Sequence, residues 1–394
     1  MKITVIGAGT IGSAIASELT QHDAVEHVQV CDARPRALRQ LHAFVRSPKL
    51  RSFQVDARDP NVLAPIVEGS ACLIGCAAPQ ANPMLAELAI HLGAHFCDLG
   101  GHDAIVREEL RLHERAAERG VWIVPNCGLA PGLVNILCLL GVDQFDAVEA
   151  AHIRVGDVPL EPHPPFNFHI SWSAHKVIED YTNEVYLVQD GQITTCPPLS
   201  HPETIRFEGF EGLEAFCTAG SLSMLAEELA GRVRTLDHKT IRRTGHRQQM
   251  AFVLGLGFGE QRIIDVRTHL TYRDVLIRRM TERLGGEHRD AVLLRIVIHG
   301  LLEGKEASLV YEMVDRYDEA HGMMAMRRCT SIATATVALM LAAGEAPGAG
   351  AAPPERALPR ALYCSRLIER GLPMTSAWHD GFVDVRDPLG VPHP

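Results

Sequence analysis

The chain has 394 residues, of which 46% are hydrophobic and 22% charged, and its formal net charge is −10 at pH 7. This length exceeds the size at which a single core normally stops growing, so we expect two domains, and the ordinary composition argues against disorder over most of the chain. The negative charge argues against nucleic acid and anionic membranes as partners, because both repel an acidic protein.

From residue 2 to about residue 126, short apolar runs alternate with longer stretches of helical period. We expect strands at KITVIG, HVQVCD, SFQVDA, ACLIGCAA, HFCDLGG and VWIVPN, with a helix between each run and the next. A series of about six βα units predicts an α/β fold in which a parallel, doubly wound sheet carries helices on both faces.

Beyond about Gly141 the pattern becomes that of hairpins. EVYLVQDGQITT reads as two strands joined at Asp190-Gly191, a pair that favours a tight turn because such turns need a positive φ. AVLLRIVIHGLLEGKEASLVYEMVD reads as a second pair with its turn in the segment Glu303 to Glu306. Strands that pair with their sequence neighbours predict a second domain of α+β type, over residues 131–328, with an antiparallel or mixed sheet.

The segment 329–394 is expected to hold a long helix, a connector and a tail. The helix CTSIATATVALMLAA is expected to return and pack on the first domain, and its most apolar part is too short and too rich in threonine to span a bilayer. Residues 344–355 are rich in glycine, alanine and proline, which predicts a flexible connector. A short helical stretch follows in ALPRALYCSRLIERG.

The ten cysteines are scattered, without a CxxC pair, and many lie in apolar runs. We therefore expect buried free thiols in a reducing compartment, the cytoplasm, rather than a disulfide framework or a zinc knuckle. Strand-like sequence begins at Lys2, so no signal peptide is expected ahead of it. His91, His95, Cys97 and His102 do not predict a metal site, because alternate positions on a buried strand do not converge.

The stretch VIGAGTIGSAIASEL places Gly7, Gly9 and Gly12 directly after the first expected strand and at the start of a helix. Asp32 follows 20 residues after Gly12, at the end of the second strand. In this context the first glycine allows a tight turn, the second lets the backbone approach a pyrophosphate, and the third lets the helix lie close to the sheet. We therefore predict a Rossmann-type dinucleotide-binding domain over residues 1–130.

The residues expected to contact the dinucleotide lie in this loop and at the carboxyl ends of the strands. They are Gly7, Gly9, Thr10, Ile11, Gly12, Asp32, Ala33, Arg34, Asp56, Ala77, Ala78 and Asn126. The Asp32 carboxylate favours NAD, since it can bond the ribose 2′-hydroxyl and would repel the 2′-phosphate of NADP. Arg34 and Arg36 could accommodate that phosphate, so NADP stays the alternative. Asp56 could reach the adenine or could cap the helix ahead of Asn61.

Two polar residues after the fifth strand, Asp98 and His102, are expected to lie nearest the nicotinamide, because ligands of open α/β sheets bind beyond the carboxyl ends of the strands. Each could instead serve a turn or a helix cap. In the second domain, HKTIRRTGHR could present Lys239, Arg242 and His246 to a small anionic group, since arginine suits a carboxylate. The alternative is a solvated strand edge guarded by charge.

Five stretches resemble the saccharopine dehydrogenase and reductase family, and within it the lysine 6-dehydrogenases: VIGAGTIGSAIASEL, NCGLAPGLVNIL, HKVIEDYTNEVYLVQDGQI, GLEAFCTAGSLSML and KTIRRTGH. The resemblance implies NAD-dependent oxidation of the terminal amine of an amino acid, with L-lysine giving a semialdehyde that cyclises to piperideine carboxylate. It also implies that the second domain binds substrate, acts as a lid and forms the contacts of a homo-oligomer, a dimer or an assembly of dimers. The cofactor supplies the redox chemistry, so the protein must orient the substrate and manage one proton.

The resemblance further implies roles for individual residues. The base that takes the amine proton would be Asp98 or His102, with His175 and Tyr181 as further candidates. Arg242 or Lys239 would meet the α-carboxylate, and Glu211 or Glu214 the α-ammonium. The remaining substrate contacts would come from Thr218, Ser221, Thr240 and His246.

One departure from the family pattern bears on the substrate. Relatives that handle saccharopine tend to carry an acidic residue before the proline of NCGLAPG, where this chain has Ala130, and this argues against a substrate as bulky and charged as saccharopine. Trp172, in HISWSAHK, could shift the pocket away from lysine. Two alternatives stay open: a reductase or synthase of the saccharopine or carboxynorspermidine type, which joins an amine to a carbonyl through an imine, and a non-catalytic dinucleotide-binding protein.

Overall fold

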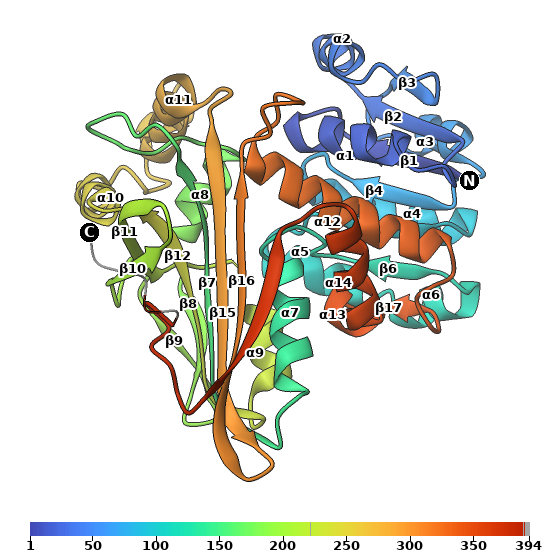
Figure 1. Ribbon diagram of the computed structural model, residues 1–394. Helices are drawn as coiled ribbons and strands as arrows, with labels where there is room; N and C mark the ends of the chain where they lie inside the picture. The colour runs from blue at the N-terminus through green and yellow to red at the C-terminus, as the bar shows by residue number, and fades with distance from the viewer. Residues whose placement is uncertain (221, 389, 391–394) are drawn as a thin grey trace. The chain divides into compact units, whose positions relative to one another are not determined.

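The computed structural model describes residues 1–220, 222–388 and 390, and it divides the chain into two compact units (Figure 1). Unit 1 comprises Met1–Leu137 and Arg327–Leu372, and unit 2 comprises Cys138–Met326 and Pro373–Pro394. Among the described residues, no helix combines the length and the apolar character needed to cross a bilayer.

Unit 1 is built on a seven-stranded sheet in which every strand pair is parallel, as the βα pattern predicts. Its order is β17-β6-β5-β4-β1-β2-β3. The strands are β1 (Lys2–Ile6), β2 (His27–Asp32), β3 (Leu50–Gln54), β4 (Cys72–Gly75), β5 (His95–Asp98), β6 (Trp122–Val124) and β17 (Gly350–Ala351). The order reverses between β3 and β4, so right-handed crossovers put the helices that follow β1 and β2 on one face and those that follow β4 and β5 on the other.

The helices of unit 1 begin and end as their sequences indicate. For example, α3 starts at a capping aspartate, Asp59, and α4 and α6 end at glycines with positive φ, Gly93 and Gly120. The set is α1 (Thr10–Thr20), α2 (Pro35–Phe44), α3 (Pro60–Val67), η1 (Pro79–Ala81), α4 (Asn82–Leu92), α5 (Asp103–Leu110), α6 (His113–Arg119), α13 (Pro354–Ala357) and α14 (Arg360–Glu369). The boundary between the units falls within α7 (Leu133–Val142) and near the start of α12 (Ala325–Ala342).

The structure differs from the expectation of a flexible connector at residues 344–355. This segment contains β17, which continues the parallel sheet beside β6. The Gly350 N–H donates to Val121 O at 2.9 Å, and the Ala352 N–H donates to Ile123 O at 3.1 Å. Composition alone misses this strand, because its pairing depends on a neighbour more than 200 residues earlier in the chain.

Unit 2 contains a nine-stranded mixed sheet, as the hairpin pattern predicts, with the path β10-β11-β12-β7-β15-β16-β18 and the hairpin β8–β9 joined to β12. Only the β12–β7 pair is parallel among the described strand pairs of this sheet. The strands are β7 (Ala147–Pro159), β8 (Val185–Gln189), β9 (Gln192–Cys196), β10 (Glu203–Phe207), β11 (Phe210–Cys217), β12 (Val233–Arg243), β15 (Asp290–Leu302), β16 (Lys305–Arg316) and β18 (Met374–Asp380).

Both predicted hairpins are confirmed. β8 and β9 pair around Asp190 and Gly191, which have φ of 49° and 75°, and β15 and β16 turn at Glu303 and Gly304, with φ of 53° and 75°. The rest of unit 2 comprises α8 (Ala174–Asp180), α9 (Ser223–Leu229), α10 (His246–Gly255), α11 (Tyr272–Leu284) and a small ribbon of β13 (Ile263–Asp265) and β14 (Leu270–Thr271).

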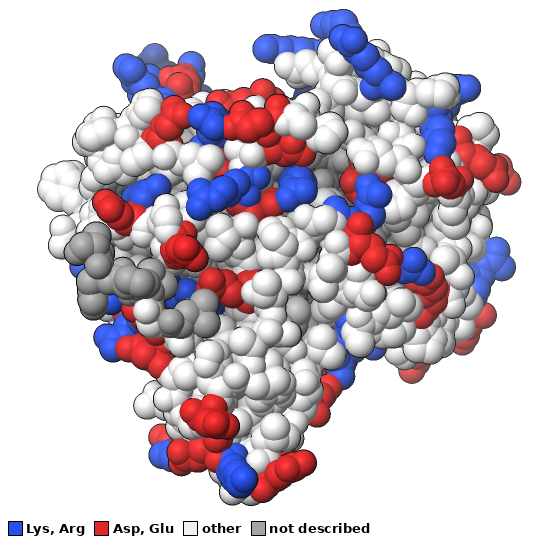
Figure 2. Space-filling view, in the orientation of Figure 1, with Lys and Arg blue, Asp and Glu red and all other residues white. Residues whose placement is uncertain are grey.

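The state of the cysteines agrees with the expectation of buried free thiols. All ten cysteines are free thiols, and all but Cys76 are buried. On the face drawn in Figure 2, acidic and basic side chains are interspersed, so neither sign dominates that view.

Candidate active site

The glycine loop of unit 1 has the shape that a dinucleotide requires. Gly7 has a φ of +117°, and a Cβ added there would lie 2.4 Å from the carbonyl oxygen of Cys76. A Cβ on Gly12 would lie 1.9 Å from the Gly7 oxygen, so neither position accepts a side chain. A Cβ on Gly9 would meet nothing within 4 Å, which leaves open space at the N-terminus of α1. This combination fits a pyrophosphate approaching the backbone at Gly9 and the positive end of the helix.

Asp32, at the end of β2, holds this loop to the strand. Its Oδ2 accepts from the Ala8 N–H at 2.8 Å, and its Oδ1 accepts from the Arg34 N–H at 2.8 Å. The Arg34 guanidinium forms a bidentate pair with the same carboxylate, with both N···O distances at 3.0 Å. Burial alone would raise the pKa of Asp32, but the hydrogen bonds from Arg34 and Ala8 outweigh it and lower the pKa, so the carboxylate is charged at neutral pH.

The other predicted cofactor residues lie around this loop. Thr10 and Ile11 open α1, Ala33 and Arg34 directly follow β2, and Ala77 and Ala78 follow β4. Asp56 is half-buried and pairs with Arg58 through an Nη2–Oδ2 contact of 2.7 Å. The capping alternative for Asp56 is wrong, because Asp59 caps α3 by accepting from the N–H groups of Asn61 and Val62.

Asp98 ends β5 and is completely buried. Its Oδ1 accepts from the Gly100 N–H at 2.5 Å and from the Asn126 N–H at 3.2 Å, so it ties the turn after β5 to the turn after β6. Burial raises the pKa of Asp98, although its hydrogen bonds with Glu109, Gly100 and Asn126 oppose the shift. Glu109, on α5, is equally buried, and burial together with the charge of Asp98 raises its pKa far above the usual range. At neutral pH this pair therefore retains at least one proton.

His102 is the N-cap residue of α5 and is exposed. The sequence pattern groups it with Asp98 because both lie at or just beyond the carboxyl end of β5. The structure separates them by burial. Asp98 is buried and accepts hydrogen bonds from two backbone N–H groups, whereas His102 is exposed to solvent.

In unit 2 three of the predicted substrate residues meet. Arg242 Nε donates to the Tyr181 hydroxyl at 3.1 Å, and that hydroxyl lies 3.0 Å from His246 Nε2. Burial lowers the pKa of His246 well below its usual value, and the charge of Arg242 adds to the effect, so His246 is neutral. The Tyr181 hydroxyl thus accepts from Arg242 and shares a second hydrogen bond with His246, so the three side chains form one connected network.

Arg242 is held on its other side by Asp157, a residue of β7 that sequence reasoning missed. Its Nη1 lies 2.9 Å from Asp157 Oδ1, while the rings of Phe168 and Trp172 each lie 5.2 Å from the guanidinium carbon. Arg242 Nη2 takes part in none of the hydrogen bonds that the structure describes. The available signal was that the strand-like run IRVGDVPL carries two charged residues, Arg154 and Asp157, among apolar ones.

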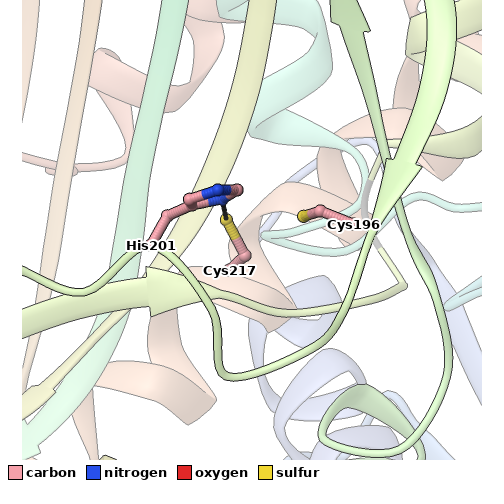
Figure 3. A group of neighbouring side chains, drawn as sticks. All are labelled: Cys196, His201 and Cys217. Atoms are coloured by element: carbon pink, nitrogen blue, oxygen red, sulfur yellow. Dashed lines mark hydrogen bonds between the residues drawn. The ribbon is translucent and has the colours of Figure 1, made fainter.

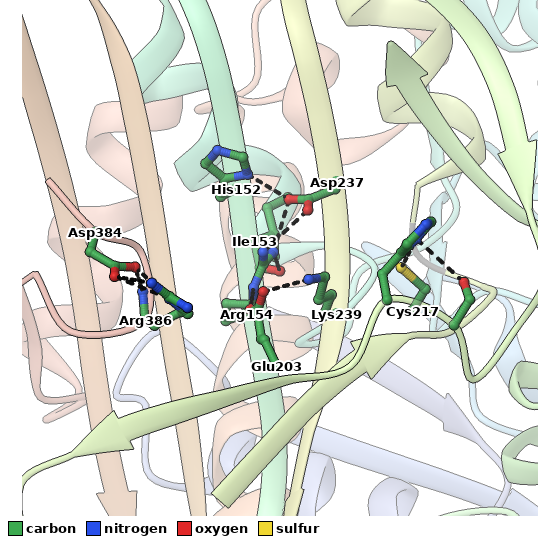
Figure 4. Close-up of polar contacts among 11 residues, drawn as sticks. His152, Ile153, Arg154, Glu203, Cys217, Asp237, Lys239, Asp384 and Arg386 are labelled. Atoms are coloured by element: carbon green, nitrogen blue, oxygen red, sulfur yellow. Dashed lines mark hydrogen bonds and ion pairs between the residues drawn. The ribbon is translucent and has the colours of Figure 1, made fainter. Parts of the chain in front are cut away.

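Lys239 and Arg242 do not form one row on β12, because residues three apart in a strand point to opposite faces. Lys239 contacts Glu203, and Arg154 bridges Glu203 and Asp237 on the same face (Figure 4). Thr240 shares the face of Arg242 and bonds the Thr218 hydroxyl at 2.7 Å.

The remaining predicted substrate residues do not join this cluster. Glu214 accepts from the Arg247 N–H at 2.9 Å, Glu211 and His175 are exposed, and Ser221 lies outside the described residues. The roles of all these residues toward a substrate stay predictions.

Comparison with known proteins identifies the fold and its family. Residues 3–124 match the family model of the saccharopine dehydrogenase NADP binding domain, and residues 128–372 match that of the saccharopine dehydrogenase C-terminal domain. The carboxyaminopropylagmatine dehydrogenase of Synechocystis sp. is 19% identical over 215 residues, which are 52% of this chain and 53% of that enzyme. This chain thus aligns with about half the length of that curated relative.

Two solved structures share the fold over nearly the whole chain. Apo saccharopine dehydrogenase (L-Glu forming) from Saccharomyces cerevisiae has a TM-score of 0.78 at 15% identity, covering 95% of this chain and 99% of that one. Homospermidine synthase from Legionella pneumophila, in complex with NAD, has a TM-score of 0.69 at 14% identity, covering 98% and 96%. The resemblance noted in the sequence is thereby confirmed at the level of the family, and the chain belongs to the saccharopine dehydrogenase family, an oxidoreductase family of dehydrogenases acting on amine groups.

Proposed function

We propose that this protein uses NAD to oxidise the terminal amine of an amino acid to an imine, with L-lysine as the leading substrate; water then hydrolyses the imine to the 6-semialdehyde and releases ammonia. The observation that carries the cofactor choice is the Asp32 carboxylate, which is ionised, lies at the end of β2 and is bonded to the glycine loop. A carboxylate at this position favours a ribose hydroxyl and repels a 2′-phosphate. Family membership supports an amine as the reducing substrate.

A bound dinucleotide would supply the hydride acceptor for oxidation of the carbon that carries the amine. The chain itself must take a proton from the amine nitrogen, and a base for this step has to reach the substrate. We assign this step to His102, because its ring is exposed and histidine is the side chain that most often serves as a general base. Asp98 is completely buried, and we assign it the positioning of the turns at Gly100 and Asn126.

We assign the substrate carboxylate to Nη2 of Arg242. Tyr181 and Asp157 fix the other two nitrogens of this guanidinium, so its plane is held in one orientation before an anion arrives. Arginine presents donors in a planar fork that suits a carboxylate. Thr218 and Thr240, which lie on the same face of the sheet, offer hydroxyls to the same substrate.

A matched pair of substrates tests this proposal: L-lysine and pentane-1,5-diamine, which has the same terminal amine but lacks the carboxylate. We expect NADH formation with lysine and a kcat/KM at least about tenfold lower with the diamine, equivalent to about 1.4 kcal/mol of lost binding. In Arg242→Lys the advantage of lysine should shrink, because lysine cannot present the same fork. No NADH formation with lysine, ornithine or the diamine would refute the dehydrogenase proposal.

A second candidate, reductive joining of an amine and a carbonyl compound, is supported by the alignment to carboxyaminopropylagmatine dehydrogenase. It predicts oxidation of NADH or NADPH only when an amine and an aldehyde or keto acid are supplied together. Binding of NAD without turnover in either direction would instead favour a non-catalytic dinucleotide-binding protein.

A further inference from the structure

Three side chains able to bind a soft metal ion gather where β9 and β11 end: Cys196, His201 and Cys217 (Figure 3). Cys196 is the last residue of β9, Cys217 is the last residue of β11, and His201 lies in the loop that leads from β9 to β10. Figure 3 shows the His201 ring and the Cys217 thiol pointing toward one another, with the Cys196 thiol on the same side. The sulfur and nitrogen atoms all lie within 4.8 Å of one another.

The loop that carries His201 is fastened to the strand that carries Cys217. The Leu199 N–H donates to Cys217 O at 2.8 Å, and the Cys217 N–H donates to Ser200 O at 3.0 Å. Leu199 and His201 have φ of 60° and 48°, so the chain turns sharply on both sides of Ser200. These backbone hydrogen bonds therefore hold the His201 imidazole beside the Cys217 thiol, whether or not a metal ion is bound.

The spacing matches tetrahedral zinc. With Zn–S bonds of about 2.3 Å and Zn–N bonds of about 2.05 Å, a tetrahedral site places sulfur about 3.6 Å from nitrogen and two sulfurs about 3.8 Å apart. Cys217 Sγ lies 3.6 Å from His201 Nδ1. The Cys196 sulfur lies at most 4.8 Å from the other two ligand atoms. It would therefore have to move by no more than about 1 Å to reach the tetrahedral S···S distance of about 3.8 Å.

We propose that Cys196, His201 and Cys217 bind one Zn²⁺ ion, with water as the fourth ligand on the exposed side of His201. Binding releases one proton from each thiol, so the two thiolates balance the charge of the ion, and no oxidant or reductant is needed. The ion joins the end of β9, the loop before β10 and the end of β11. This proposal does not depend on the catalytic activity, because it concerns a link within unit 2.

A second group of ligand types, Asp157, His169 and Asp290, is less suited to a cation. Arg242 already pairs with Asp157, and Asp290 accepts from the N–H groups of Ala325 and Met326. A divalent ion there would lie beside a buried guanidinium. At the cysteine site, by contrast, the neighbouring Lys239 ammonium is paired with Glu203 (Figure 4).

The test uses the purified full-length chain, stripped with a chelator under reducing conditions and titrated with Zn²⁺ or with Co²⁺ as a spectroscopic probe. We expect one ion per chain, a thiolate-to-cobalt charge-transfer band, and protection of two thiols from alkylation. Cys217→Ser and the exposed-site variant His201→Ala should weaken zinc binding by about 100-fold or more. Cys364→Ser and His91→Ala serve as matched controls and should bind as the wild type does.

Three results would overturn the proposal. The first is a stoichiometry below half an ion per chain at saturating zinc. The second is zinc binding that is unchanged in both Cys217→Ser and His201→Ala. The third is a disulfide between Cys196 and Cys217 in freshly isolated, unreduced protein. Since His201 is exposed, His201→Ala should fold normally, so a loss of binding in that variant reports on the site itself.

Discussion

The buried carboxyl pair of unit 1 makes the stability of the protein depend on pH, and Glu109→Gln should remove much of that dependence. Glu109 and Asp98 are both completely buried, and the pKa of Glu109 is raised by burial and by the charge of Asp98. Glutamine has nearly the same shape as glutamic acid but no ionisable group. The substitution thus removes the titration while keeping the packing on α5.

The sign and size follow from linkage. Glu109 keeps its proton in the folded chain at pH values where the unfolded chain has lost it, so the folded state binds more protons and becomes less stable as the pH rises. The loss begins above the ordinary glutamate pKa of about 4.3 and amounts to about 1.4 kcal/mol per pH unit, or about 4 kcal/mol between pH 5 and pH 8. Over that range the stability of Glu109→Gln should therefore rise relative to the wild type by up to about 4 kcal/mol.

The measurement is denaturant unfolding at pH 5, 6, 7 and 8, accompanied by hydrogen exchange of peptides from β5 and α5. Hydrogen exchange is needed because a chain of two compact units need not unfold in one step. Glu108→Gln is the matched control, since Glu108 is the exposed neighbour of Glu109, and its stability curve should run parallel to that of the wild type. If the curve of Glu109→Gln also runs parallel to the wild type, Glu109 is ionised in the folded protein and the reasoning is wrong.

Three further predictions concern the cofactor loop and the Arg242 cluster. Gly9→Ala should melt at or slightly above the wild-type temperature, because its Cβ meets no protein atom, yet it should bind NADH at least about tenfold more weakly in a fluorescence titration. Gly12→Ala should lower the melting temperature, because its Cβ meets the Gly7 oxygen. Asp32→Ala should lower the ratio of kcat/KM for NAD over NADP by about tenfold or more, whereas Asp56→Ala should leave this ratio unchanged, because the adenine that Asp56 could reach is common to both dinucleotides. Arg242→Met should cost about 3–5 kcal/mol in denaturant unfolding, because it removes the guanidinium partner of the buried Asp157 carboxylate and leaves it only the Ser171 hydroxyl and His169, while Tyr181→Phe should cost only about 1–3 kcal/mol.

The parts of the fold that the sequence predicts well are those fixed by local patterns. The glycine loop, Asp32 and the hairpin turn at Asp190-Gly191 each depend on residues within one βαβ unit or one hairpin, so spacing alone identifies them. The alternating apolar runs likewise predict the parallel sheet of unit 1, because buried parallel strands and amphipathic helices have different periods.

The Arg242 cluster could be predicted only in part. That Arg242 and Lys239 point to opposite faces follows from their spacing of three in a strand and was available from the sequence. The contacts of Arg242 with Tyr181 and Asp157 could not be predicted from the sequence. β12 pairs in parallel with β7, which lies about 80 residues earlier in the chain, and only the register of this pair brings Asp157 beside Arg242. Contacts of this kind are decided by tertiary packing rather than by local preference.

The contrast between Asp98 and His102 shows what a position at a strand end does and does not imply. Asp98 ends β5 and His102 follows four residues later, at the sheet edge where ligands of open α/β sheets bind, and the sequence treats them alike. A carboxyl with no exposure that accepts two backbone N–H bonds can fix the turns that surround a ligand, but moving a proton to a bound amine requires contact with that amine. The end of β5 therefore offers two different environments: the buried Asp98 holds the surrounding turns, and the exposed His102 is the residue to which we assign the proton transfer in the proposed function.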